Sequence, residues 1–113
     1  LLAMTQESFD KFSGSVKNNG VIIADTTYVK NIGDVQAKIF ACPITELTQK
    51  ELGSRLYANV AALGMLAYLF STIDFHFFEE AVSDRVPTAF REANMNALRA
   101  GYRWAEEYAQ ERM

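Results

Sequence analysis

An uncharged stretch from Leu56 to Ile73 constrains the fold of this chain more than any other feature of its sequence. A helix of that length lies at the lower limit of what can cross a bilayer. Two observations favour a helix buried between protein layers: Asn59 lies inside the stretch, and its small residues permit close packing of a second helix. Those small residues are Ala58, Ala61, Ala62 and Gly64. We therefore expect a core helix here, and no membrane span.

This expected helix is apolar on nearly all sides. One face carries Leu56, Val60, Leu63, Ala67 and Phe70, and the opposite side carries Tyr57, Ala61, Gly64 and Tyr68. After it, Asp74 is a good N-cap for a further helix, with Ile73 placed to pack on Phe78 as a hydrophobic staple. A last helix after Pro87 has an apolar stripe of Phe90, Ala97, Gly101, Trp104 and Tyr108, flanked by Met95, Leu98, Tyr102 and Ala105. A glycine inside a helix costs about 1 kcal/mol relative to alanine, so we expect Gly101 to allow close packing.

The N-terminal part has strand patterns. Val21–Asp25 is a continuous apolar run, β-branched at its first three positions and closed by a polar residue, and Ala37–Pro43 is a second apolar run. Continuous apolar strands are typical of parallel sheets that are covered on both faces. The opening "LLAM" predicts a buried strand leading into a short helix capped by Thr5, and everything from Thr45 onward is predicted helical. We expect a single α/β domain over residues 1–113, with three layers, a mostly parallel Rossmann-like sheet and a helical C-terminal half.

Composition narrows the class of partner and cofactor. The net charge is −3, the sequence pI is about 5.1 and no basic stripe is present. Nucleic acids and anionic membrane surfaces are therefore poor candidates as partners. The single cysteine cannot form an internal disulfide, nor supply the four thiolates that an iron–sulfur cluster usually needs. The features of a signal peptide are missing, and we expect a cytoplasmic protein.

Two residues are candidates for cofactor binding. Asp25 ends a strand, where α/β folds bind ligands, although the alternative that it forms a turn before Thr26 and Thr27 needs no ligand. Asn59 either points its amide into a cleft or interface, or satisfies a neighbouring backbone group because it is buried. The same two alternatives apply to Asn94.

Catalytic and metal-binding patterns are weak. Cys42 lies at a strand end near a helix N-terminus, which would lower a thiol pKa, but a buried inert cysteine fits as well. His76, the only histidine, has no second histidine or cysteine at ligand spacing, so packing or the surface explains it. Glu79 and Glu80 are adjacent on a helix and do not face one another. We predict no catalytic and no metal-binding residue in this chain.

Three segments together carry a resemblance to a known family. They are "YANVAALG" from Tyr57, "IDFHFFEEAV" from Ile73 and "NMNALRAGY" from Asn94. In this order they resemble the gamma subunit, or gamma domain, of the 2-oxoacid:ferredoxin oxidoreductases, which act on pyruvate, branched-chain 2-oxoacids, indolepyruvate or 2-oxoglutarate. The family's pattern begins with an Asn followed by an apolar stretch that ends in Leu-Gly, and Asn59, Leu63 and Gly64 match this part. The pattern ends with Asn-x-x-Ala, an aromatic residue or Leu, and Gly-Tyr. Asn94, Ala97, Leu98, Gly101 and Tyr102 match that end.

The resemblance implies a subunit without its own chemistry. The assembled enzyme would oxidatively decarboxylate a 2-oxoacid to acyl-CoA, using thiamine diphosphate, Mg²⁺, iron–sulfur clusters and coenzyme A that companion alpha, beta and delta-type subunits hold chiefly. Ferredoxin would accept electrons through the complex. This chain would have a structural, active-site-flanking role.

One departure from the family is clear. A first strand with a Gly-rich turn is missing, because the six glycines of this chain are scattered singly. We expect a shorter relative or a C-terminal piece, whose uncovered sheet edge favours self-association or a partner. The alternative is a non-catalytic α/β module that binds a nucleotide or a protein.

Overall fold

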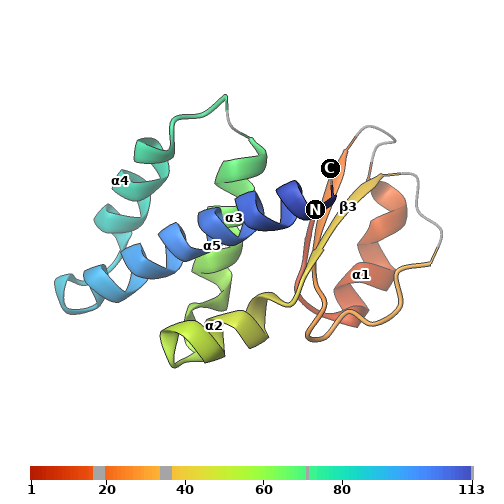
Figure 1. Cartoon of the computed structure of the whole chain (residues 1–113), viewed down its shortest axis with the longest axis horizontal. Helices are drawn as coiled ribbons and strands as arrows, with labels where there is room; N and C mark the ends of the chain where they lie inside the picture. The colour runs from red at the N-terminus through yellow and green to blue at the C-terminus, as the bar shows by residue number, and fades with distance from the viewer. Residues whose placement is uncertain (17–19, 34–36, 71, 113) are drawn as a thin grey trace. The chain divides into compact units, whose positions relative to one another are not determined.

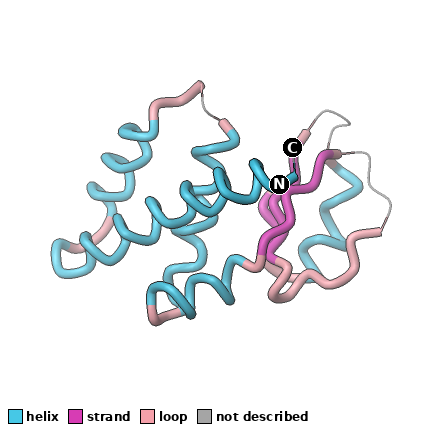
Figure 2. Tube along the Cα trace, in the orientation of Figure 1, coloured by secondary structure: helices cyan, strands magenta, loops and turns pink. Residues whose placement is uncertain are grey.

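The computed structural model describes the backbone of residues 1–16, 20–33, 37–70 and 72–112. These residues form two compact units, Leu1–Leu47 and Thr48–Met113. The first unit holds the strands, and the second unit consists of helices joined by loops (Figure 2). The predicted change from a sheet to a helical C-terminal half is therefore confirmed.

The first unit is built on a parallel sheet in the order β1-β2-β3. The strands are β1 (Leu2–Ala3), β2 (Val21–Asp25) and β3 (Lys38–Cys42). In this register Ile23 lies opposite Leu2 on one side and Phe40 on the other. The strands expected at Val21–Asp25 and Ala37–Pro43 are confirmed, each within two residues.

The opening segment is less buried than the sequence suggested. Strand β1 has two residues, of which Ala3 is fully buried and Leu2 is 37% exposed. The expectation of a buried strand across "LLAM" is therefore wrong for the two leucines. Leu1 precedes β1 and Leu2 begins it, and β1 has a neighbour on one side only in the described sheet.

Helix α1 (Gln6–Phe12) lies beside the sheet of the same unit (Figure 1). Thr5 caps it as expected, since its hydroxyl accepts a hydrogen bond from the Ser8 amide at 3.1 Å. Phe9 points into the core of this unit, whereas Phe12 remains 45% exposed. The core consists of Ala3, Phe9, Ile22, Ala24, Val29 and Ala37.

The remaining helices begin with α2 (Ile44–Leu52), which starts in the first unit and ends in the second. The second unit then contains α3 (Ala58–Leu69), α4 (Phe75–Arg85) and α5 (Arg91–Arg112). Short 3-10 turns, Arg55–Tyr57 and Thr88–Phe90, precede α3 and α5. The predicted N-cap of α4 is confirmed, because the Asp74 carboxylate accepts a hydrogen bond from the His76 amide at 2.9 Å.

Helix α3 corrects the interpretation of the uncharged stretch. The helix covers twelve residues, and the large apolar residues on either side of it are exposed: Leu56 by 85%, Phe70 by 48% and Ile73 by 46%. Its buried residues are Ala58, Ala61, Ala62, Gly64, Met65 and Ala67. The buried face is therefore the one with small residues, and the stretch is not buried on all sides. Among the described helices, none is long and apolar enough to span a membrane.

Helices α3 and α5 pack with their backbones in contact. A Cβ atom built on Gly64 would lie 2.0 Å from the carbonyl oxygen of Leu98, and one built on Gly101 would lie 1.7 Å from that of Ala61. Such distances are far inside van der Waals contact, so each glycine makes room for the backbone of the other helix. The close approach predicted for Gly101 is confirmed. Figure 1 shows α5 crossing α3 within the second unit.

Candidate functional site

The carboxyl ends of β2 and β3 form the place where a ligand site was expected. Asp25 and Cys42 end these strands as register partners, and both are fully buried. Open parallel α/β sheets bind ligands outside this edge, commonly with an anion at the N-terminus of the following helix. Here that helix is α2, which begins two residues after Cys42.

The Asp25 carboxylate occupies the N-terminus of α2. Its oxygens accept hydrogen bonds from the Thr45 amide at 3.2 and 3.3 Å and from the Thr45 hydroxyl at 2.5 Å. The Thr27 amide donates a further bond to it, at 3.0 Å. A negative charge at a helix N-terminus is favoured by the amides and the helix dipole. Asp25 therefore caps α2 from β2, the neighbour of the strand that leads into this helix.

The turn after Asp25 completes this closure. The Thr27 hydroxyl accepts a hydrogen bond from the Glu46 amide at 3.0 Å, and the Thr26 amide donates to the carbonyl of Cys42 at 2.9 Å. The Asp25 carbonyl in turn accepts from the amide of Val29 at 2.8 Å. Successive amides of α2 are thus satisfied by the chain itself. The turn-forming interpretation of Asp25 is confirmed, and its role in cofactor binding stays a prediction.

The two asparagines have different surroundings. Asn59 is exposed on α3, because the buried face of that helix carries Ala58, Ala61 and Ala62 instead. The expectation that its amide is buried is therefore wrong, and its binding role stays a prediction. Asn94 donates a hydrogen bond from Nδ2 to the carbonyl of Phe90 at 2.8 Å, which is the backbone-satisfying role.

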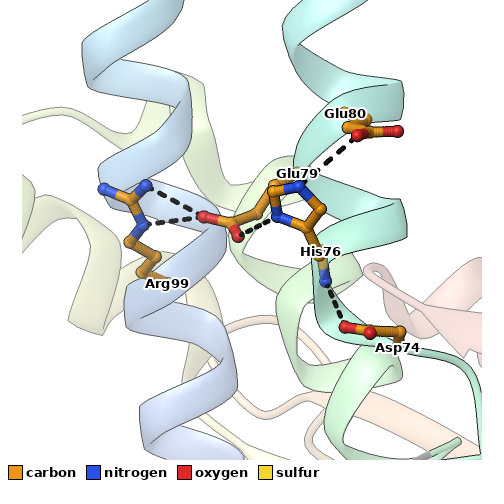
Figure 3. A network of polar contacts seen from close by, with 5 residues as sticks. All are labelled: Asp74, His76, Glu79, Glu80 and Arg99. Carbon is orange, nitrogen blue, oxygen red and sulfur yellow. Dashed lines mark hydrogen bonds and ion pairs between the residues drawn. The ribbon is translucent and has the colours of Figure 1, made fainter.

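A polar cluster on α4 and α5 was not anticipated. His76 contacts both neighbouring carboxylates, Glu79 through Nδ1 at 3.5 Å and Glu80 through Nε2 at 3.4 Å. Arg99 of α5 binds Glu79 with Nε at 3.0 Å and Nη2 at 2.9 Å. Figure 3 shows Glu79 between His76 and Arg99. The spacing from His76 of three and four residues was the available signal for the first two contacts.

This cluster lines a hollow of about 300 Å³ between α4 and α5. The hollow is lined by His76, Glu79, Glu80, Ser83, Asp84, Met95 and Arg99. The His76 side chain is 73% exposed, so its contacts with carboxylates are surface contacts. Within the described ranges, no group of three His, Cys, Asp or Glu side chains is arranged to hold a metal ion.

A second unanticipated contact joins α2 to α5 inside the second unit. One carboxylate oxygen of Glu51 accepts hydrogen bonds from Arg103 Nη2 and from Trp104 Nε1, both at 2.9 Å. Trp104 is 1% exposed, so Glu51 satisfies the one polar atom of a buried ring. Throughout the part of the chain that the structure describes, every buried side-chain nitrogen and oxygen has a hydrogen-bond partner.

Comparison with known proteins gives consistent results. The profile of the family described as pyruvate ferredoxin/flavodoxin oxidoreductase matches residues 1–104. The crystal structure of a keto/oxoacid ferredoxin oxidoreductase gamma subunit from Geobacter sulfurreducens superposes with a TM-score of 0.89 at 34% identity. That superposition covers 95% of this chain and 63% of the other, which confirms the Rossmann-like α/β fold.

Two curated relatives differ in how much of them is matched. The 2-oxoglutarate synthase subunit KorC of Methanocaldococcus jannaschii is 28% identical over 95% of this chain and 58% of its own length. The ketoisovalerate oxidoreductase subunit VorA of Methanothermobacter marburgensis is 30% identical over 95% of this chain, but over 23% of its own length. This chain thus spans under three fifths of the first relative and under a quarter of the second.

Proposed function

The chain belongs to the pyruvate ferredoxin/flavodoxin oxidoreductase family, and we propose that it forms the gamma-type part of a 2-oxoacid:ferredoxin oxidoreductase. The observation that carries this proposal is the similarity to a gamma subunit at 34% identity and a TM-score of 0.89. Identity at that level supports more than a shared fold, because it extends over 95% of this chain.

The proposed substrate class is the 2-oxoacids. Relatives named for 2-oxoglutarate and for ketoisovalerate match nearly the whole chain, and the family is named for pyruvate. These compounds share a carboxylate next to a ketone and differ in their side chains. We propose oxidative decarboxylation to an acyl-CoA, with ferredoxin as electron acceptor, and we leave the side chain open.

The proposed role of this chain is structural and active-site-flanking. At the sheet edge where a ligand is expected, Asp25 itself fills the N-terminus of α2. The match to a quarter of VorA supports the same role, since in that relative the matched region is part of a much longer subunit. A region that occurs inside a larger chain is expected to pack against the rest of it.

The cofactors of the assembled enzyme belong to companion subunits in this proposal. A four-thiolate iron–sulfur cluster does not fit this chain, because Cys42 is its single cysteine. Thiamine diphosphate with Mg²⁺, the clusters and coenzyme A are therefore assigned to alpha, beta and delta-type partners. Thiamine diphosphate supplies the carbanion chemistry of decarboxylation when it is bound. We propose the cytoplasm as the location of this complex.

Reconstitution tests the proposal. This chain is co-expressed with a thiamine-binding and a cluster-binding companion, and 2-oxoacid-dependent viologen reduction is measured with coenzyme A present. We expect turnover from the assembled complex and none from the chain alone, because its described residues offer no acid–base set near a substrate. Turnover by the isolated chain, or a chain that never associates with such companions, would overturn the proposal.

A further inference from the structure

The outer face of α4 is exposed although it carries an aromatic side chain. Four residues with helical spacing share this face: Phe77, Glu80, Ala81 and Asp84. All four are exposed, and Phe77 retains 64% of its accessible surface. Val82 is the one buried residue of this helix. We refer to these four residues as the α4 face.

The α4 face is flanked by hollows on both sides. One hollow, of about 270 Å³, is lined by Phe77, Glu80, Ala81, Asp84 and Arg85. The other is the hollow of about 300 Å³ towards α5, and Glu80 and Asp84 line it as well. The two carboxylates therefore stand on a ridge between two concave surfaces. Phe77 and Ala81 make the wall of the first hollow partly apolar, and Met95 does so in the second.

The charge of this surface is acidic on balance: three carboxylates line the two hollows, against the two guanidinium groups of Arg85 and Arg99. Arg99, which lines the second hollow, is already bound to Glu79 through two hydrogen bonds. Glu80 contacts His76 at 3.4 Å but stays 67% exposed, and Asp84 is exposed as well. A second copy of the α4 face would bring carboxylates against carboxylates, which is unfavourable. A basic partner is therefore favoured over self-association through this face.

We propose that the α4 face docks a basic amphipathic helix of a companion subunit. This inference rests on the proposed function, which supplies the partner class. An apolar side chain of that helix fills the hollow beside Phe77, and Lys or Arg side chains face Glu80 and Asp84. Phe77 and Asp84 are seven residues apart, about 10 Å along a helix, so the basic residues lie one to two turns from the apolar anchor.

Site-specific cross-linking in the assembled complex tests the contact directly. Phe77 is replaced by a photoreactive phenylalanine analogue, and the same replacement at Phe90, 55% exposed in the same unit, serves as the matched control. We expect Phe77 to cross-link to a Lys- or Arg-containing helix of a companion subunit. Cross-linking to a second copy of this chain, or an intact complex without any cross-link at Phe77, would overturn the inference.

Charge reversal tests the proposed contact of basic side chains with Glu80 and Asp84. The double variant Glu80→Lys with Asp84→Lys is titrated with the companion subunits at low and at high salt, against Glu106→Lys as the control. We expect affinity to fall by about tenfold or more for the double variant, with the loss reduced at high salt. Circular dichroism confirms that each variant is folded. An unchanged affinity of the folded double variant contradicts the inference.

The experiments distinguish a failure of the docking surface from a failure of the proposed function. If the unmodified chain assembles with its companions and supports turnover, yet the α4 variants bind equally well, the docking surface is wrong and the subunit assignment stands. If the unmodified chain does not bind the companions at all, the proposed function fails, and the inference fails with it.

Discussion

The two helices that pack on α5 are attached in contrasting ways. Helix α3 meets α5 through Gly64 and Gly101, where no Cβ atom fits between the backbones. Helix α4 meets α5 through side chains: the ion pair of Glu79 with Arg99 and the ring contact of Phe75 with Tyr102, whose centroids are 4.8 Å apart. The first contact is fixed by atoms that every residue carries. The second contact is made by side chains, and each of them can be removed by a single substitution.

The largest expected effect comes from filling the glycine contact. We expect Gly101→Ala and Gly64→Leu each to lower the free energy of unfolding by about 3 kcal/mol, the upper end of the usual cost of overpacking, because the obstructing atoms are backbone and cannot rotate away. Urea denaturation measures the change. Gly14→Ala is the control, since a Cβ atom placed on Gly14 would have nothing within 4 Å. A loss below about 1 kcal/mol would show that the helices separate easily.

A smaller effect is expected from the aromatic contact. Tyr102 packs on Phe75 of α4 and on Tyr68 of α3, with ring centroids 5.4 Å apart in the second pair. Because Tyr102 is only half-buried, we expect Tyr102→Ala to cost about 2 kcal/mol by thermal or urea unfolding. Tyr28→Ala, at a tyrosine that is 42% exposed, provides the comparison. Equal losses of unfolding free energy from the two variants would show that the ring contacts of Tyr102 do not stabilise the packing of the helices.

The ion pair between α4 and α5 should contribute less again. Arg99 is 58% exposed and Glu79 is 20% exposed, so solvent screens their attraction. We expect Arg99→Ala to cost about 0.5–1 kcal/mol, and the cost to shrink in high salt. Arg91→Ala, at an exposed arginine of the same helix, is the control. A loss that is large and independent of salt would mean that Arg99 packs as well as pairs.

The smallest effect is expected on the α4 face. Phe77→Ser should change the free energy of unfolding by about 0.5 kcal/mol or less, because the ring is 64% exposed. Urea denaturation measures this change, and the same variant should weaken binding to companion subunits. A large loss of stability without any loss of binding would show that Phe77 serves packing instead of docking.

The elements with a specific local signal could be predicted from the sequence. Thr5 and Asp74 are caps whose oxygens accept hydrogen bonds from amides within three residues, and the strand at Val21–Asp25 begins with three β-branched residues in a row. Gly101 was predicted to allow close packing because a helix-interior glycine needs a reason. Asp25 could be placed at a strand end, but its partner Thr45 is twenty residues further on.

The buried face of α3 and the contact between α4 and α5 had no sequence pattern that could predict them. In α3 both the leucine face and the alanine–glycine face are apolar, so periodicity does not indicate which one is buried. Backbone contact with α5 selects the small residues, and Asn59 is exposed as a result. The contact between Glu79 and Arg99 crosses twenty residues and depends on how two helices pack. Fold class and caps follow from local rules, whereas the candidate docking surface follows from packing.

The paired glycines also affect how this domain can diverge during evolution. Gly64 of α3 faces the backbone of α5, and Gly101 of α5 faces the backbone of α3. A larger residue at either position forces the two helix axes apart. Once the axes are further apart, the other position no longer requires glycine. A lineage that loses one glycine is therefore free to lose its counterpart, and one that keeps the close crossing must inherit both. Related sequences should thus show glycine at positions 64 and 101 together or at neither, and this linkage can be checked in a collection of homologues without any structure.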